Sequence, residues 1–176
     1  MLLRRRRNRR LISGVNLEIR KAGEEDREAV WAILEPVIRA GETYALQRDL
    51  SRESALAYWF ADANLVFVAE AGGSVVGTYL LRANQAGGGA HVANCGYLTA
   101  ASATGQGVAR AMCAHSLEEA RVRGYRAMQF NLVVSSNERA VRLWGSFGFE
   151  IVGRLPEAFE HPALGFVDAY VMYRRL

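Results

Sequence analysis

The sequence has too few cysteines to hold a domain together by disulfide bonds. Only Cys95 and Cys113 occur among its 176 residues, and neither belongs to a CxxC pair or a Cys/His cluster of the kind that binds zinc. Cys113 falls on the apolar face of a predicted helix, which favours a place in the core over a reactive role. We therefore expect a reducing, cytoplasmic compartment and no metal site.

Long apolar runs are also missing. No stretch approaches the roughly 18 residues that span a membrane, and the N-terminus lacks the apolar segment of a secretory signal. Hydrophobic residues make up 51% of the chain and charged residues 23%, as in ordinary globular domains. A chain of this length can bury the core of one such domain, and we expect no membrane partner.

Positive charge is concentrated at the N-terminus. Residues 1–14 hold six arginines and no acidic residue, which leaves residues 15–176 with a formal charge of −2 although the whole chain carries +4. A short basic block can bind nucleic acid, but the rest of the chain has no basic stripe interleaved with aromatic residues. We interpret residues 1–14 as a disordered basic tail, with a translation start at Val15 as one version of that interpretation. We expect residues 15–176 to form one domain with no nucleic-acid partner.

Hydrophobic periodicity predicts helices and strands in mixed order. Pro36 is expected to kink or end the first helix, and Gly72-Gly73 to turn a hairpin. The order predicts an α+β domain with one central sheet. The predicted strands cover residues 17–20, 65–71, 74–83, 91–99, 128–134, 149–155 and 170–176, and the predicted helices cover residues 24–38, 51–61, 107–123 and 137–147.

A glycine-containing turn precedes the clearest helix. The segment Thr104-Gly105-Gln106-Gly107-Val108-Ala109 follows a predicted strand and opens the helix over residues 107–123. Free N–H groups at a helix start, approached closely through glycines, bind pyrophosphate well. The spacing matches neither a Walker A loop nor the Rossmann fingerprint. A plain tight turn between strand and helix remains an alternative.

This segment resembles the acyl-CoA motif of the Gcn5-related N-acetyltransferases, Q/R-x-x-G-x-G/A. The resemblance covers about residues 17–176. It implies the acyl-CoA N-acyltransferase fold, which has a single mixed, mostly antiparallel sheet of about seven strands flanked by helices, and it implies acetyl-CoA as the cofactor. A second element of the family, N-x-x-A-x-x-(L/F)-(Y/W)-x-x-x-G-F, is present as Asn137, Ala140, Leu143, Trp144, Gly148 and Phe149.

The resemblance also implies a cofactor site. In that fold the fourth and fifth strands splay apart, and the pantetheine arm lies between them, bonded by the backbone of Leu98 and Thr99. Asn137 would contact the cofactor, although an N-cap is an equally good interpretation. The pyrophosphate would lie on the backbone of the turn, made by Thr104, Gly105, Gln106, Gly107, Val108 and Ala109.

Two positions depart from the family pattern. Thr104 stands where the motif has arginine or glutamine, so a charge-assisted phosphate contact is lost, and Arg110 is the candidate replacement. Trp144 stands where a tyrosine is often proposed as the general acid, and an indole cannot release a proton near neutral pH. A thiol of pKa about 8.5 leaves without such help, so we assign no general acid. These departures keep a non-catalytic CoA-binding sensor as an alternative.

Two asparagines point to the reaction site. Asn94 and Asn131 lie in the strands that would splay, and strand alternation allows both to line the gap. The segments at residues 41–44, 91–94, 130–133 and 167–173 resemble a family branch that acetylates proline analogues such as azetidine-2-carboxylate. By that resemblance Asn94 holds a substrate carboxylate and Asn131 orients the thioester carbonyl or the amine. Two buried asparagines that repair a broken ladder are the alternative.

The general base is open, because asparagine cannot accept a proton. The candidates are Glu42, His91, His161 and Asp168, and the resemblance also gives Glu42 and Tyr44 to the substrate site. The sequence predicts transfer of acetyl from acetyl-CoA to the amine of a small molecule, with an amino acid or proline analogue as one choice. A protein N-terminal or lysine acetyltransferase is an alternative, and a homodimer is left open.

Overall fold

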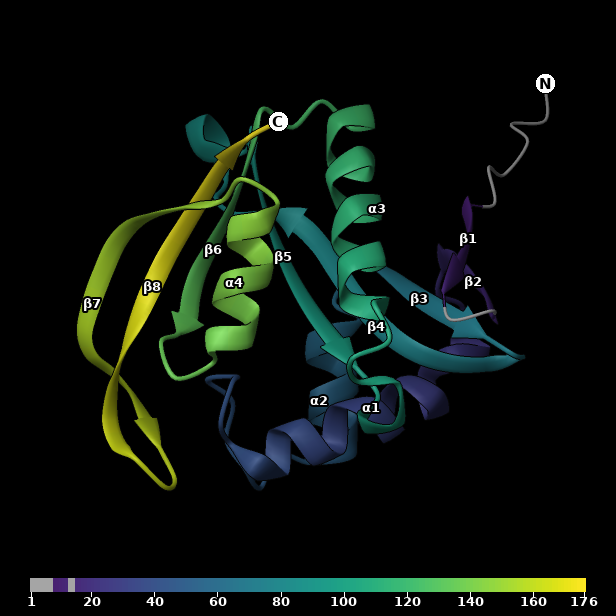
Figure 1. Ribbon diagram of the computed structural model, residues 1–176, viewed down its shortest axis with the longest axis horizontal. Coiled ribbons are helices and arrows are strands. Elements are labelled where there is room, and N and C mark those ends of the chain that lie inside the picture. Colours follow the sequence, from purple (N-terminus) through teal and green to yellow (C-terminus); the bar gives the residue numbers. More distant parts are fainter. Residues whose placement is uncertain (1–7, 13–14) are drawn as a thin grey trace.

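The fold is a single sheet with helices on both faces. The computed structural model describes residues 8–12 and 15–176. Helices α1 and α2 cover one face of the sheet, and α3 and α4 cover the other (Figure 1). In the described part of the chain no helix is long and apolar enough to cross a bilayer.

The strands lie in the order β1-β2-β3-β4-β5-β6-β8-β7, and neighbours are antiparallel except for the parallel pair β5 and β6. The fold class expected from the sequence is therefore confirmed. The strands are β1 (Asn8–Ile12), β2 (Val15–Lys21), β3 (Leu65–Ala71), β4 (Ser74–Ala83), β5 (Val92–Thr99), β6 (Ala127–Val134), β7 (Glu150–His161) and β8 (Gly165–Arg175). The helices are α1 (Arg27–Ala40), α2 (Arg52–Trp59), α3 (Val108–Val122) and α4 (Glu138–Ser146), with short 3-10 turns at Glu24–Asp26, Gly87–Gly89 and Ala101–Ala103.

Strand β1 corrects part of the predicted disordered tail. Residues 1–7 and 13–14 lie outside the described residues, but Asn8–Ile12 pair antiparallel with β2, from Asn8 opposite Ile19 to Ile12 opposite Val15. The edge of β2 offers a row of backbone N–H and C=O groups, and any extended segment nearby can pair with it. The tail prediction considered side-chain charge and missed this backbone pairing.

Helix α1 corrects the prediction at Pro36, because it continues through this residue to Ala40. Proline removes the hydrogen bond to the carbonyl four residues earlier, here Ala32. Both residues are exposed, so water can solvate that carbonyl. Leu34 and Ile38, on either side of Pro36, are buried against the sheet and hold the helix in place.

Two hydrophobic cores lie on opposite faces of the sheet. The core under α3 contains a stacked pair, Phe67 and Tyr79, whose ring centroids are 4.8 Å apart. The Tyr79 hydroxyl lies 2.6 Å from Nδ1 of the buried His115, and burial lowers the pKa of His115. Cys113 is fully buried in the same core, as expected, and burial raises its pKa to about 12, which makes it unreactive.

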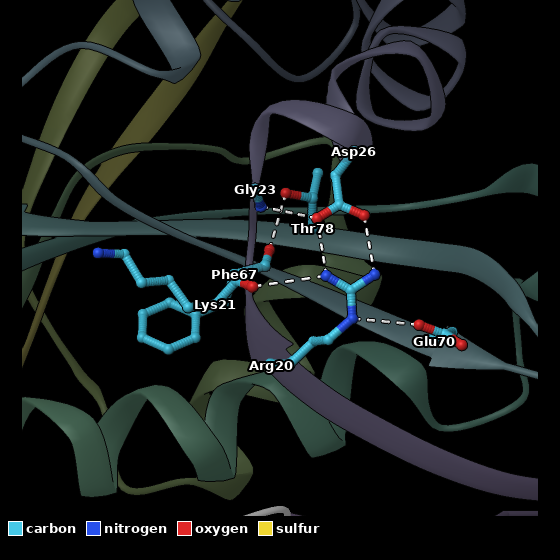
Figure 2. Close-up of polar contacts among 7 residues, drawn as sticks. All are labelled: Arg20, Lys21, Gly23, Asp26, Phe67, Glu70 and Thr78. Atoms are coloured by element: carbon cyan, nitrogen blue, oxygen red, sulfur yellow. Dashed lines mark hydrogen bonds and ion pairs between the residues drawn. The ribbon is translucent and has the colours of Figure 1, made fainter. Parts of the chain in front are cut away.

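An ion pair fixes the start of α1 on the sheet (Figure 2). Arg20 of β2 donates from its two terminal nitrogens to the carboxylate of Asp26, at 2.7 and 2.8 Å, and from Nε to Glu70 at 3.2 Å. Asp26 also accepts from the backbone N–H of Gly23 at 2.8 Å. The hydrogen bonds from Arg20, together with the one from Gly23, lower the pKa of Asp26 even though its burial opposes this.

We predict that Asp26→Asn lowers the free energy of unfolding by about 1–3 kcal/mol at neutral pH, because Arg20 loses one of its two charged partners. Since the pKa of Asp26 is lower in the folded state, its contribution is present above the unfolded pKa of about 3.9 and is lost as the pH falls through the folded pKa. Urea unfolding at a series of pH values measures the difference between wild type and variant, which should shrink below about pH 4. Glu118→Gln, in an exposed pair with Arg121, is the control and should cost less than about 1 kcal/mol. A loss in Asp26→Asn that does not change with pH would contradict this account.

Candidate active site

The parallel strands β5 and β6 diverge after a short stretch of pairing. Their ladder holds only Val92 opposite Ala127 and Ala93 opposite Met128. Beyond these pairs a cavity of about 350 Å³ opens between the strands. The expected splaying of the two strands is therefore present.

The register of β5 decides which backbone groups face this gap. Ala100 donates to Val76 in β4, and Val92 accepts from Asn84 just beyond it. In an antiparallel ladder every second residue bonds to the same neighbour, so Leu98 faces β4 with its N–H and C=O. The prediction that the Leu98 backbone bonds the pantetheine arm is corrected, because the groups directed toward β6 belong to Tyr97 and Thr99.

Asn94 lies where the parallel ladder ends. Its side-chain N–H donates to the backbone carbonyl of Gln129 at 2.9 Å, one residue past the last paired position of β6. This bond satisfies a carbonyl that would otherwise lose its strand partner, as the structural interpretation of Asn94 expects. The side chain also lines the cavity, so one remaining N–H and the amide oxygen can meet a ligand.

Asn131 lies on the same side of the gap and is exposed. Its amide oxygen accepts from Gln129 Nε2 at 2.8 Å, and its nitrogen donates to Asn84 Oδ1 at 2.7 Å. These two contacts fix which way the amide points and leave one N–H free. Because Asn131 is exposed, the alternative of a buried asparagine does not describe it. No local pattern in the sequence signals the supporting roles of Gln129 and Asn84.

Tyr44 reaches the gap from the loop after α1. Its hydroxyl donates to the carbonyl of Tyr97 at 3.3 Å. A Cβ on Gly96 would lie 2.8 Å from the hydroxyl oxygen of Tyr44, so only glycine at this position allows Tyr44 to approach β5 this closely. Burial raises the pKa of Tyr44 well above its ordinary value, so the hydroxyl stays protonated and acts as a donor.

The four base candidates do not line this cavity. Glu42 is exposed, and the His91 ring nitrogen lies 3.1 Å from the Gly88 carbonyl. His161 accepts a hydrogen bond from the Ala163 N–H at the tip of the β7–β8 hairpin. Asp168 accepts from the N–H of Glu157 and pairs with Arg154, and these contacts lower the pKa of its carboxyl.

A second cavity, of about 470 Å³, opens at the start of α3. Gly105 and Gly107 have φ angles of 85° and 81°, which L-residues with a side chain rarely adopt. Most of the residues predicted to hold the cofactor line this cavity, whereas Gln106 is turned aside and donates to the Ser102 carbonyl. The predicted residues on its wall are Thr99, Thr104, Gly105, Gly107, Val108, Ala109, Arg110 and Asn137.

Arginines give this second cavity a positive wall. Arg110 lines it and donates to Ser146 at 3.1 Å. Arg139 also lines it, and its guanidinium lies 3.5 Å from the position of a Cβ on Gly105. Arg139 therefore supplies, from α4, charge that Thr104 cannot supply in the turn, and the sequence analysis missed it. Glycine backbone and arginines together fit a pyrophosphate.

The two cavities meet at the aromatic pair Trp144 and Tyr97, which line both of them. The ring centroids are 4.8 Å apart. The Tyr97 hydroxyl lies 2.6 Å from the Ser116 hydroxyl in the core, and burial raises its pKa far above its ordinary value. Tyr97 is therefore not a substitute for the general acid that is missing because Trp144 stands at the tyrosine position. Asn137, which also lines both cavities, caps α4 through the N–H of Ala140 at 3.2 Å.

A glycine turn with arginines beside it, joined to a gap between splayed strands, fits an acyl-CoA-dependent transferase. The family profile "Acetyltransferase (GNAT) family" matches residues 28–149, which is more than half of the chain. The chain therefore belongs to the acetyltransferase (GNAT) family, a class of acetyl-CoA-dependent acyltransferases.

Solved and curated relatives agree with this assignment. A GCN5-related N-acetyltransferase from Kribbella flavida is 40% identical, with a TM-score of 0.87 over 91% of this chain and 98% of that chain. A phosphinothricin acetyltransferase (Pat) from Sinorhizobium meliloti, solved with AcCoA, is 19% identical and shares the fold, with a TM-score of 0.80 over 91% of this chain and 88% of that one. N-acetyltransferase aca1 of Schizosaccharomyces pombe is 30% identical over 99 residues, 56% of this chain and 47% of that protein. This chain thus matches about half the length of that curated relative.

We predict that Gly107→Glu abolishes binding of CoA, because it puts bulk and negative charge where the backbone would meet phosphate. Gly124→Glu is the matched control, since Gly124 has a φ of 82° at the other end of α3 and open space around it. Both variants should lose about 1–2 kcal/mol of stability from backbone strain, but only Gly107→Glu should lose the calorimetric signal for CoA. Normal CoA binding by a folded Gly107→Glu variant would refute the site.

Arg139→Gln should weaken CoA binding by about 10-fold or more while leaving stability unchanged, because the exposed guanidinium loses only a charge-assisted phosphate contact. Calorimetric titration at two salt concentrations provides the measurement, and the loss should be smaller at high salt. An unchanged dissociation constant would remove Arg139 from the cofactor site.

Proposed function

We propose that this protein transfers an acetyl group from acetyl-CoA to the amine of a small molecule, with amino acids and proline analogues as the acceptor class. The observation that supports this most directly is the junction of the two cavities at Trp144 and Tyr97. One cavity suits the phosphates of a CoA, and the other is a smaller space between the splayed strands with Tyr44, Asn94 and Asn131 on its wall. Bound acetyl-CoA would supply the acetyl group as an activated thioester.

The polar groups around the gap suit such a transfer. Asn131 has one N–H left after its contacts with Gln129 and Asn84, and we assign to it the orientation of a carbonyl or an amine at the reaction centre. A donor that is fixed before the reaction stabilises developing charge without reorganisation. Asn94 and Tyr44 line the same space, and we assign them to the acceptor. The proton that the amine loses would pass to water, because no described carboxylate or imidazole lines the cavity.

The resemblance of this chain to the branch that acetylates azetidine-2-carboxylate is part of this proposal. The fold likeness to a phosphinothricin acetyltransferase and the match to aca1 are compatible with it. The alternative within the family is a protein acetyltransferase. A match with a ribosomal-protein-alanine N-acetyltransferase from Brucella melitensis gives this alternative some weight. That protein is 27% identical, with a TM-score of 0.78 over 90% of this chain and 99% of that one. A cavity of about 350 Å³ suits a free amino acid better than a folded protein terminus.

Release of free CoA thiol from acetyl-CoA tests the proposal directly. The acceptors are L-proline, L-azetidine-2-carboxylate, phosphinothricin, a polyamine and a short peptide with an N-terminal alanine. We expect turnover with one or more of the first three and the N-acetylated product by mass spectrometry. Turnover with the peptide alone would favour the protein acetyltransferase, and CoA binding without any turnover would favour the sensor.

We predict that Asn131→Ala lowers kcat by about 10²–10³-fold, the usual cost of losing a preorganised polar contact. Because Asn131 is exposed, its melting temperature should hardly change. Steady-state kinetics with the best acceptor, together with thermal melts, separates the two effects. A variant with normal kcat would remove Asn131 from the reaction site.

Asn94→Ala should behave differently from Asn131→Ala. Its loss leaves the Gln129 carbonyl without a partner, which should cost about 1–3 kcal/mol of stability. If Asn94 also holds the acceptor, KM should rise with kcat less affected. A destabilised variant with unchanged KM would leave Asn94 with only its structural role at the end of the ladder.

A further inference from the structure

One arginine changes the electrostatics of the acceptor cavity. Arg82 lines this cavity and is half-buried. Every other described residue on the cavity wall is uncharged. The acceptor cavity therefore carries one positive charge and no negative one on the described wall.

The sheet geometry places Arg82 beside the two asparagines. Arg82 of β4 lies directly opposite Asn94 of β5 in the antiparallel register, so their side chains leave the sheet on the same face. Leu80, two residues earlier, packs in the core under α1 and α2, which identifies that face. Asn84, two residues later, holds Asn131. Arg82, Asn94 and Asn131 therefore face the same part of the cavity.

The guanidinium has no partner in the described part of the chain. No hydrogen bond or ion pair joins Arg82 to another described residue, unlike Arg20 of β2, which holds two carboxylates. Taking a charge partly out of water without a partner costs free energy. An anion that enters the cavity would recover this cost, and a guanidinium presents two parallel donors that match a carboxylate.

The same charge acts on the amine. A positive group nearby disfavours the ammonium form and lowers the pKa of an amine, so the acceptor is shifted toward the neutral form that can attack a thioester. An acceptor with further positive charges meets no described acidic group on the wall that could bind them.

We propose that Arg82 selects the acceptor by binding its carboxylate, with the free N–H of Asn94 as a second donor. This inference rests on the proposed function and narrows it: the acceptors are amines that carry an acid group, and polyamines, amino-acid amides and peptide amines are disfavoured. Arg82 was not among the residues singled out in the sequence, because nothing in its local pattern separates it from any other arginine in a strand.

Matched acceptor pairs test the proposal through kinetics. L-proline and L-prolinamide differ only in the acid group, as do L-azetidine-2-carboxylate and its amide. For wild type we expect kcat/KM to favour each acid by about 10- to 150-fold, the range for a hydrogen bond to a charged group. Arg82→Gln should remove most of this preference through KM and leave the amides within about twofold of wild type. Arg82→Lys should restore part of it, and Arg121→Gln, on the exposed face of α3, should change nothing.

Calorimetry keeps the proposal testable even if no amine is turned over. N-acetyl-L-proline and N-acetyl-L-prolinamide are titrated into wild type and into Arg82→Gln in the presence of saturating CoA, after melts show that the variant is folded. Wild type should bind the acid more tightly, and the variant should bind both alike. Equal binding of both probes by wild type, binding of neither, or an equal loss of both in Arg82→Gln would overturn the inference. Failure of turnover with all amines alongside a preserved preference for the acid would instead refute the proposed function alone.

Discussion

The early end of pairing between β5 and β6 is the constraint on which the rest of the site depends. Two residue pairs hold the strands together, and past them the backbone groups of Tyr97 and Thr99 face a gap in place of a neighbouring strand. Unpaired backbone groups in an interior are costly, so the surrounding residues are arranged to meet them. Asn94 closes the last carbonyl of β6, and the Tyr44 hydroxyl reaches Tyr97. The gap between β5 and β6 is thus open, and side chains satisfy the backbone groups at the end where strand pairing stops.

The two faces of the sheet supply different chemistry to this gap. The face under α3 and α4 is apolar and rich in aromatic residues, and it ends in the Trp144 and Tyr97 pair and the glycine turn. The other face is covered by α1 and α2 only as far as Leu80 and Leu98, and beyond them it becomes polar. A CoA approaching from one face and an amine approaching from the other would meet between the strands. This geometry separates the cofactor cavity from the acceptor cavity without a second domain.

Much of this could be predicted from sequence, because the signals are local. Hydrophobic period, N-caps such as Ser51, and the glycine turn are properties of neighbouring residues, and they gave the elements and the cofactor side of the site. The missed features depend on residues far apart in the chain. Arg139 of α4 lies close to Gly105 in the turn before α3, and Asn131 donates to Asn84, which is 47 residues away in the sequence. The backbone direction of Leu98 follows from a register that only the pairing with β4 defines.

The acceptor cavity offers few groups that could exchange a proton with the acceptor. On the described wall of the acceptor cavity there is no carboxylate or imidazole, and Tyr44 and Tyr97 are held protonated by burial. A general base in direct contact with the acceptor is therefore missing from this wall, and the ionisation of the amine must be controlled by its surroundings. In the proposal made above, the guanidinium of Arg82 would do this by lowering the pKa of a nearby amine, and the exposed side of Asn131 would give the released proton a path to water. Under the proposed function, the residue that selects the acid group of the acceptor also prepares its amine for attack.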